Sequence, residues 1–227
     1  MQSYKPSFIE FMLRNGVLQF GDFVTKSGRS TPYFINTGRY RTGTQMRMLA
    51  RFYADAIETR GVEFDFLFGP AYKGIPLVVA IAMELSERGR DVPFCFNRKE
   101  VKDHGEGGWL VGHQPSAGER ALLVEDVTTA GTSIRETVPR LQAVAPLQLA
   151  GLIVSVDRME RGRGHASAFE ELRAEFGFDA FAIVTIDEVV EHLCVTPVDG
   201  QLVIDGASLE RIRRYRETYG PRPQAGA

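Results

Sequence analysis

Cysteine and histidine are scarce in this chain of 227 residues, and neither is spaced as a metal site requires. Only two cysteines are present, and Cys95 lies inside an apolar run, so we expect Cys95 and Cys194 to be reduced thiols in or near the core. The four histidines show no metal-ligand spacing with one another: His104, His113, His165 and His192. The sequence therefore argues against a disulfide framework and against a metal site built from these residues.

Long apolar segments and an excess of one charge are also missing. The longest strongly apolar run, Ile75 to Met83, is far short of the roughly 20 residues that a membrane helix needs. The N-terminus lacks the basic-then-apolar pattern of a secretory signal. Lys and Arg number 27 against 29 Asp and Glu, which argues against nucleic-acid or anionic-membrane binding. We expect a cytoplasmic protein that binds neither nucleic acid nor a membrane.

No low-complexity linker divides the chain, so we expect one domain over residues 1–219 and a flexible tail over 220–227. After Gly61, continuously apolar strands alternate with helices, which predicts an α/β fold with a parallel sheet covered on both faces. The expected strands are 18–24, 33–36, 64–68, 92–96, 121–125, 149–156 and 181–185. The expected helices are 7–14, 44–59, 76–88, 133–144, 168–176, 186–193 and 208–215.

The segment from Leu122 to Ser133 is the most informative part of the chain. An apolar strand ends in two carboxylates, Glu125 and Asp126, and a small hydroxyl-rich loop then leads into a helix. Such a loop directs unpaired backbone N–H groups toward one point, where an anion binds. The carboxylates lie where the ends of parallel strands face ligand, and they can accept hydrogen bonds from two ribose hydroxyls. We therefore predict a site for a phosphorylated sugar at Glu125, Asp126, Val127, Thr128, Thr129, Ala130, Gly131, Thr132 and Ser133.

The plain alternative is that these Thr and Ser residues only cap the helix. Capping does not call for a carboxylate pair directly after an apolar strand, which favours the binding site. No Gly-Lys-Ser/Thr follows, so the segment is not a Walker loop, and it lacks the GxGxxG pattern of dinucleotide folds.

A second turn, from Phe68 to Gly74, follows the first strand of the expected sheet. Glycine and proline at the end of a strand predict a sharp turn beside the ligand, and Lys73 adds a cation there. A lysine with converging backbone N–H groups suits a pyrophosphate. Taken alone, such a segment is more often an ordinary turn than a binding site.

The third segment, Asn97 to Gly108, is polar and rich in glycine. It cannot bury a hydrophobic face, so we expect a mobile loop. A solvated loop without function is the alternative. Beside a pyrophosphate site, however, its basic residues become candidates for holding a pyrophosphate that leaves the sugar: Arg98, Lys99, Lys102 and His104.

Two further segments, 25–36 and 156–162, suggest what kind of molecule would accept the phosphorylated sugar. Arg158 follows a strand of the expected sheet and could pair with a planar carboxylate, which uracil and the purines lack. By itself Arg158 could equally be a solvated charge in a polar loop.

The motifs stand in an order that resembles the orotate phosphoribosyltransferase family, within the type I phosphoribosyltransferases. They are Lys-Ser-Gly-Arg followed by Pro-Tyr-Phe, then Gly-Pro-Ala-Tyr-Lys-Gly-Ile-Pro, then Arg-Lys-Glu-x-Lys-Asp-His-Gly-Glu-Gly, then the segment from Leu122 to Ser133, and finally Asp-Arg-x-Glu-Arg-Gly. The resemblance runs from about Phe20 to Gly164. Ile35 departs from it, because an aromatic is frequent there, and so does Glu125, which replaces a frequent Asp.

The resemblance implies a site for each substrate, phosphoribosyl pyrophosphate (PRPP) and orotate. Orotate would contact Lys26, Phe34, Ile35, Thr129 and Arg158. PRPP and its pyrophosphate would contact residues 125–133 together with Tyr72, Lys73, Arg98, Lys99, Lys102 and His104. Lys102 and Asp126 would carry the catalysis, and a non-proline cis peptide would join Ala71 to Tyr72.

The resemblance also implies Mg²⁺ held mainly by PRPP, with Glu125 and Asp126 nearby. A small hood, mainly residues 1–40 with part of the C-terminal region, would cover the base. A mobile catalytic loop would reach across a homodimer interface, so that each active site is shared. Two rival functions remain open. A phosphoribosyltransferase for another base would need no cation at Lys26 and Arg158, and a PRPP-sensing regulator would usually carry a basic nucleic-acid surface.

Overall fold

The computed structural model describes residues 1–25, 28–102, 108–128 and 130–222, and of Val101 and Lys102 it describes only the backbone. The predicted site residues Lys26, His104 and Thr129 and most of the predicted tail, residues 223–227, lie outside the described part of the chain.

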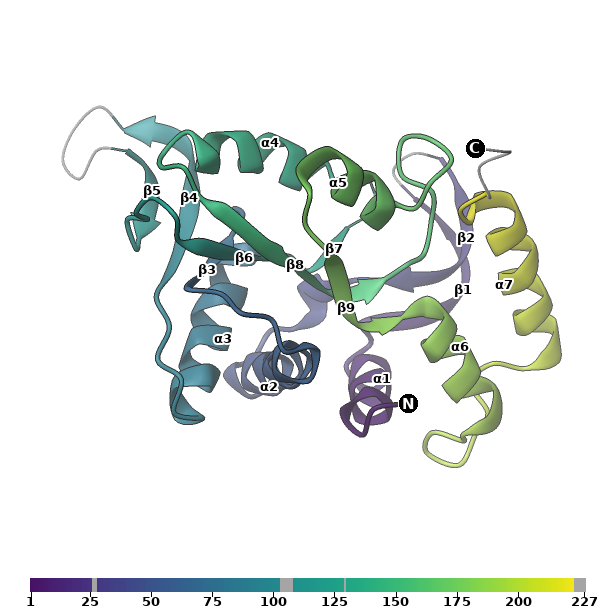
Figure 1. The fold of residues 1–227 in the computed structure, drawn as a ribbon. Helices are drawn as coiled ribbons and strands as arrows, with labels where there is room; N and C mark the ends of the chain where they lie inside the picture. The colour runs from purple at the N-terminus through teal and green to yellow at the C-terminus, as the bar shows by residue number, and fades with distance from the viewer. Residues whose placement is uncertain (26–27, 103–107, 129, 223–227) are drawn as a thin grey trace.

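The centre of the molecule is a sheet of seven strands within the described ranges (Figure 1). Its order is β5-β4-β3-β6-β8, with β9 on the far side of β8 and β7 also paired to β8. All neighbours are parallel except β4 and β5. The strands are β3 (Phe66–Gly69), β4 (Phe94–Lys102), β5 (Gly108–Gly112), β6 (Arg120–Val124), β7 (Val127–Thr128), β8 (Gln148–Asp157) and β9 (Ala180–Thr185). The predicted α/β fold with a mostly parallel sheet is confirmed.

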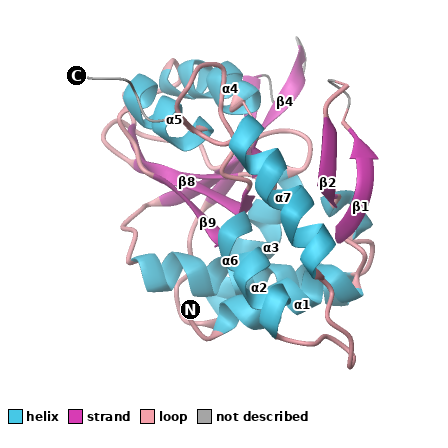
Figure 2. Cartoon of the chain, turned by 90° about the vertical axis from the view of Figure 1, so that its right-hand side faces the viewer, coloured by secondary structure: helices cyan, strands magenta, loops and turns pink. Residues whose placement is uncertain are grey.

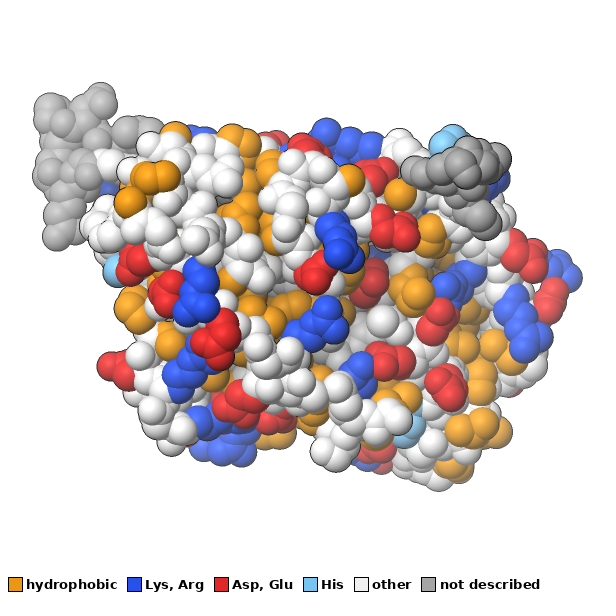
Figure 3. All heavy atoms as spheres, viewed as in Figure 1, with side chains coloured by type: hydrophobic (Ala, Val, Ile, Leu, Met, Phe, Trp, Pro, Cys, Tyr) orange, Lys and Arg blue, Asp and Glu red, His pale blue; other side chains and the backbone are white. Residues whose placement is uncertain are grey.

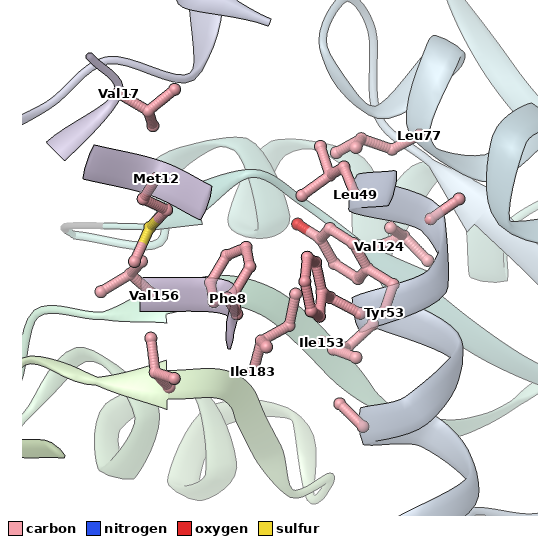
Figure 4. Close-up of a cluster of buried hydrophobic side chains, with 14 of the residues drawn as sticks. Phe8, Met12, Val17, Leu49, Tyr53, Leu77, Val124, Ile153, Val156 and Ile183 are labelled. Carbon is pink, nitrogen blue, oxygen red and sulfur yellow. The ribbon is translucent and has the colours of Figure 1, made fainter. Parts of the chain in front are cut away.

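Helices cover both faces of this sheet, as the continuous apolar strands predicted. Leu67 of β3 points into one cluster of buried side chains, whereas its neighbours Phe66 and Phe68 point into the other. In Figure 1, α4 (Thr132–Gln142) and α5 (Ala168–Phe176) lie above the sheet, and three helices lie below it: α1 (Tyr4–Arg14), α2 (Gly43–Arg60) and α3 (Gly74–Glu87). Figure 4 shows Phe8 and Met12 of α1 packed with Tyr53 of α2 and with Ile153 of β8.

A two-stranded antiparallel hairpin lies beside the main sheet. It consists of β1 (Leu18–Val24), which has the predicted bounds, and β2 (Ser30–Ile35), which begins three residues earlier than predicted and ends one residue earlier. The C-terminal helix α7 (Gly206–Tyr219) packs against β2 (Figure 2), and α6 (Ile186–Val195) precedes it in the chain. The hairpin near the N-terminus and the C-terminal helix α7 therefore meet at one end of the sheet.

Local sequence signals explain where several helices begin and end. Thr42 and Gln45 form a capping box at the start of α2, and Gly61 in the left-handed conformation ends it. The same pattern places Ser167 before α5 and Gly177 after it. The predicted bounds of α5 therefore agree fully with the structure, and those of α2 differ by one residue at each end.

One prediction for the residues that follow Phe96 is wrong. Residues 97–102 were expected to belong to a loop, but β4 continues to Lys102, and Gly108 begins the antiparallel strand β5. Trp109 and Leu110 of β5 are buried, and Asn97 is only 6% exposed because its side chain bonds to the neighbouring turn. Beyond Phe96, β4 pairs only with β5 among the described strands, so residues 97–102 need few apolar side chains, and their polar sequence resembled a loop.

None of the helices in the described ranges is long and apolar enough to cross a membrane. On the face shown in Figure 3, acidic and basic side chains are interspersed, as the balanced composition suggests.

Candidate active site

The backbone of the acidic pair belongs to the sheet itself. Val124 pairs with Ile153 and Val127 pairs with Val156, so β7 continues the line of β6 along β8. Between them, Glu125 N donates to Ile153 O at 3.0 Å, and Ser155 N donates to Asp126 O at 2.8 Å. The Ser155 hydroxyl donates to the same carbonyl at 2.5 Å. Both carboxylates are therefore held at fixed positions at the carboxyl end of the sheet.

The Asp126 side chain brings two of the predicted segments together. Lys73 Nζ lies 2.6 Å from Asp126 Oδ2 in an ion pair. The hydroxyl of Thr37, at the start of a short 3₁₀ helix (Thr37–Arg39), donates to the same oxygen at 2.5 Å and accepts from Lys73 Nζ at 2.9 Å. The turn after β3 and the segment after β6 thus meet at one carboxylate. No signal in the sequence singled out Thr37.

Glu125 has a different environment from its neighbour. Burial is the largest cause that raises its pKa from 4.5 to about 7, although the Ser133 hydroxyl, which donates to Oε1 at 2.7 Å, opposes the shift. The Tyr53 hydroxyl donates to the Glu125 carbonyl at 2.7 Å and supports the backbone from below the sheet. Glu125 therefore titrates near neutral pH, in the range useful for a group that exchanges hydrogen bonds with ligand hydroxyls.

The N-terminus of α4 is open to an anion. Gly131, in the left-handed conformation, is its N-cap, and as a glycine it has no side chain that could cap the helix. The Ser133 hydroxyl donates to Glu125, whereas Thr128 Oγ1 accepts from the backbone N–H of Gly131 at 3.2 Å. Thr128 thus bonds one backbone N–H at the start of the helix and Ser133 does not, so the capping alternative is met only in part. The N–H groups of the first turn and the helix dipole suit a phosphate.

Glycine is required at position 131. Its φ of +64° disfavours other residues, and an added Cβ would lie 3.0 Å from the side chain of Leu172. Arg135 of α4 contacts the Ala130 carbonyl and pairs with Glu171 of α5 at 3.1 Å. The loop is thus braced against α5 behind it.

The turn after β3 is tightly closed. The peptide between Ala71 and Tyr72 is cis, as the resemblance implied. An added Cβ on Gly69 would lie 2.3 Å from the Gly74 carbonyl oxygen, so only glycine fits where the backbone doubles back. Asn97 of β4 accepts from Ala71 N at 2.8 Å, a support that the sequence analysis did not identify.

Two of the predicted pyrophosphate residues lie together beyond this turn. Tyr72 is 67% exposed, and Lys99 Nζ lies 5.0 Å from the centre of its ring. Arg98 donates to the Gly108 carbonyl at 3.3 Å across the β4–β5 pair. The backbone of Lys102 pairs with Gly108 in the same ladder, and its side chain is outside the description.

Arg158 is not a solvated loop charge. It is 7% exposed and binds Glu160, which is equally buried, through Nε at 3.0 Å and Nη2 at 2.7 Å. It directly follows Asp157, whose register partner is Thr128 of the predicted phosphate-binding segment. The sequence alternative for Arg158 is therefore wrong, and the arginine stands next to the predicted phosphate site.

Phe34 and Ile35 of the hairpin, which are predicted to contact orotate, pack against other residues. Arg158 lies over the ring of Tyr33, at 5.0 Å, whereas the next residue, Phe34, stacks on Phe23 at 5.6 Å. Ile35 packs partly buried against the cluster below the sheet. Within the described residues, the hydrogen bonds and the ring contact of Arg158 involve Glu160 and Tyr33 and neither Phe34 nor Ile35, so the role of these two residues with orotate stays a prediction.

A pocket of about 170 Å³ opens beside Asp126. Its polar side is formed by Thr37, Lys73, Asp126 and Ser155, and its apolar side by α2 and α3 residues together with Tyr40. Within the described ranges, no three His, Cys, Asp or Glu side chains gather as a metal site. The Asp126 carboxylate in its lining is a hard oxygen donor of the kind that Mg²⁺ prefers.

Comparison with known proteins gives one consistent family. Residues 40–182 match the model of the phosphoribosyl transferase domain. The chain is 56% identical over 222 residues to an orotate phosphoribosyltransferase of Lachnoclostridium phytofermentans, covering 97% of this chain and 99% of that protein. It is 49% identical to one of Klebsiella pneumoniae, covering 97% and 100%. A crystal structure of orotate phosphoribosyltransferase from Francisella tularensis superposes with a TM-score of 0.83 at 37% identity, covering 94% and 99%.

Proposed function

The chain belongs to the orotate phosphoribosyltransferase family, and we propose that it transfers the 5-phosphoribosyl group of PRPP to orotate. The products are orotidine 5′-monophosphate and pyrophosphate, and the reaction is a step of de novo pyrimidine (UMP) biosynthesis. The observation that supports it most directly is the meeting of Lys73, Asp126 and the open N-terminus of α4 at one edge of the sheet, with Arg158 beside them.

PRPP would lie along this edge. Its 5′-phosphate would bind the N–H groups at the start of α4, with the hydroxyls of Thr128, Thr132 and Ser133 nearby. Its ribose hydroxyls would bind Glu125 and Asp126. The pyrophosphate would then reach the turn at Tyr72 and Lys73, whose ammonium already lies at the site.

Bond cleavage at C1 of the ribose develops positive charge on the sugar and negative charge on the departing pyrophosphate. Asp126 would stabilise the sugar side, and Lys73, Arg98, Lys99, Lys102 and His104 would stabilise the pyrophosphate. Bound Mg²⁺ would neutralise part of the charge on the pyrophosphate. It would be held mainly by PRPP oxygens, with Glu125 and Asp126 close by.

Orotate would bind through its carboxylate to Arg158 and Lys26, under a hood made mainly of residues 1–40 with part of the C-terminal region. Phe34, Ile35 and Thr129 would border the ring. We further propose that the enzyme acts in the cytoplasm as a homodimer, with the segment around Lys102 completing the partner's site.

The test is a panel of bases. The protein is incubated with Mg²⁺ and PRPP, and in parallel with orotate, uracil, adenine, hypoxanthine or guanine, and pyrophosphate release is measured. We expect turnover with orotate only, because Arg158 offers a site that needs a carboxylate. Turnover of another base would favour the first rival, and PRPP binding without turnover would favour the regulator.

A pair of arginine variants refines the panel. Arg158→Ala should raise the KM for orotate, whereas Arg173→Ala, which removes a 70% exposed arginine of α5, should not. Equal orotate KM values for the two variants would show that the base site is misplaced.

A further inference from the structure

Glu160 is the most heavily hydrogen-bonded buried carboxylate among the described residues outside the PRPP site. Its Oε1 accepts from Arg158 Nε and Nη2, from the Tyr33 hydroxyl at 3.0 Å and from the Tyr215 hydroxyl at 2.8 Å. Its Oε2 accepts from Arg29 Nη1 at 3.2 Å. A buried charge is costly unless it is fully bonded, and these five hydrogen bonds supply that compensation.

The arrangement leaves part of Arg158 for a ligand. A guanidinium carries five N–H donors, and Glu160 uses one on Nε and one on Nη2. No protein acceptor lies on Nη1 within the described residues. The Nη1–Nη2 edge is therefore available for a planar carboxylate, which it can bind through two parallel hydrogen bonds.

The donors to Glu160 come from distant parts of the chain. Tyr33 belongs to β2, Tyr215 to α7 and Arg158 to the segment after β8. Burial first, and then the Glu160 carboxylate, hold the pKa of Tyr33 well above its usual value, so its hydroxyl stays protonated and donates. The segment after Glu160 is joined to α7 a second time, because Arg161 N donates to the Tyr219 carbonyl at 2.9 Å.

We infer that Glu160 is a positioning residue for base recognition, which orients the Arg158 guanidinium toward the orotate carboxylate. Through Tyr215 it makes the C-terminal helix α7 part of that orientation, although α7 contributes no predicted substrate contact. The inference rests on the proposed function, because it assumes that Arg158 binds the base.

Glu160→Gln and Tyr215→Phe test the inference. Gln keeps the size of the side chain but removes its charge, so the arginine loses its fixed edge. Hydrogen bonds to charged groups contribute enough that we expect the KM for orotate to rise about tenfold or more for Glu160→Gln and about threefold or more for Tyr215→Phe. The KM for PRPP should change less than about twofold in both, since neither residue contacts the phosphate segment.

Tyr219→Phe is the matched control. It lies one turn further along α7, and its hydroxyl makes no hydrogen bond to Glu160, while its ring over Arg29 is retained. We expect both KM values to match those of the parent. The melting temperature of each variant shows whether it is folded, and Tyr215→Phe carries the test if Glu160→Gln fails to fold.

Three outcomes overturn the inference. In the first, the folded variants keep the parent's orotate KM. In the second, both KM values rise together, which would indicate a general loss of structure. In the third, Tyr219→Phe behaves like Tyr215→Phe. A parent enzyme that does not use orotate at all would instead refute the proposed function, so the two failures are distinguishable.

Discussion

Replacing Glu125 by Gln should make the protein's stability less sensitive to pH. The folded protein holds the pKa of this carboxyl at about 7 against an ordinary 4.5, chiefly through burial. A raised carboxyl pKa favours folding at low pH, and that contribution is lost as pH rises from about 4.5 through about 7. Between pH 5 and pH 8 the parent should therefore lose about 2 to 3 kcal/mol at this site.

Gln cannot ionise, yet its oxygen can still accept from Ser133. The free energy of unfolding of Glu125→Gln relative to the parent should therefore increase by about 2 to 3 kcal/mol from pH 5 to pH 8. For a chain of this size, that is a relative rise in Tm of about 5 to 10 °C. Urea unfolding at the two pH values measures the free energy directly.

Glu171→Gln provides the control with a shift of opposite sign. Although burial opposes it, hydrogen bonds from the backbone of Arg163 and Gly164 and from Arg135 lower the pKa of Glu171. Its titration falls below the range of the experiment, so the difference between this variant and the parent should be the same at pH 5 and pH 8. If Glu125→Gln also shows a constant difference, the buried environment assigned to Glu125 is wrong.

Three further predictions concern catalysis. Asp126→Asn should keep a Tm near the parent's, because its partner Lys73 is 61% exposed. It should nevertheless weaken PRPP use by about 1.5 to 3 kcal/mol in kcat/KM. Unchanged PRPP kinetics would show that the acidic pair is structural. Thr37→Val, which removes a hydroxyl donor to Asp126, should raise the KM for PRPP about tenfold. The control Thr59→Val, on the exposed face of α2, should leave this KM unchanged. Equal PRPP KM values for the two variants would show that Thr37 has no role in the site. Lys102→Ala should lose most of kcat, and refolding it together with Asp126→Asn should restore activity that neither variant has alone, because a mixed dimer would contain one intact site. A mixed dimer that forms in a tagged pull-down yet stays inactive would refute the shared site.

Local patterns in the sequence were sufficient to predict the arrangement of residues 122–133. A strand, two acids, a small loop and a helix are adjacent in the chain, so their relative placement follows from backbone geometry alone. The same holds for α2 and α5, whose capping residues and terminal glycines mark their ends. The turn at Lys73 could also be predicted, because a strand that ends in Gly-Pro directs the next residues to the ligand edge.

Edge strands and side-chain partners could not be predicted in this way. Strand β5 and the second half of β4 are stabilised by pairing with each other, and the polar residues of β4 carry no periodic signal. Thr37 meets Asp126 across 89 positions of sequence, and Tyr33 meets Glu160 across 127. Such contacts depend on how the hairpin and α7 pack against the sheet, which no local pattern encodes.

The sequence by itself determined the fold class and the residue types that suit a phosphoribosyl transfer, and it predicts which segment would bind an anion. Only the tertiary structure decided that Lys73 and Thr37 share one oxygen of Asp126, and that Arg158 is a buried side chain oriented by Glu160. The physical reason is that charge and hydrogen-bonding capacity belong to each residue. Burial and partnership arise only when distant segments come together.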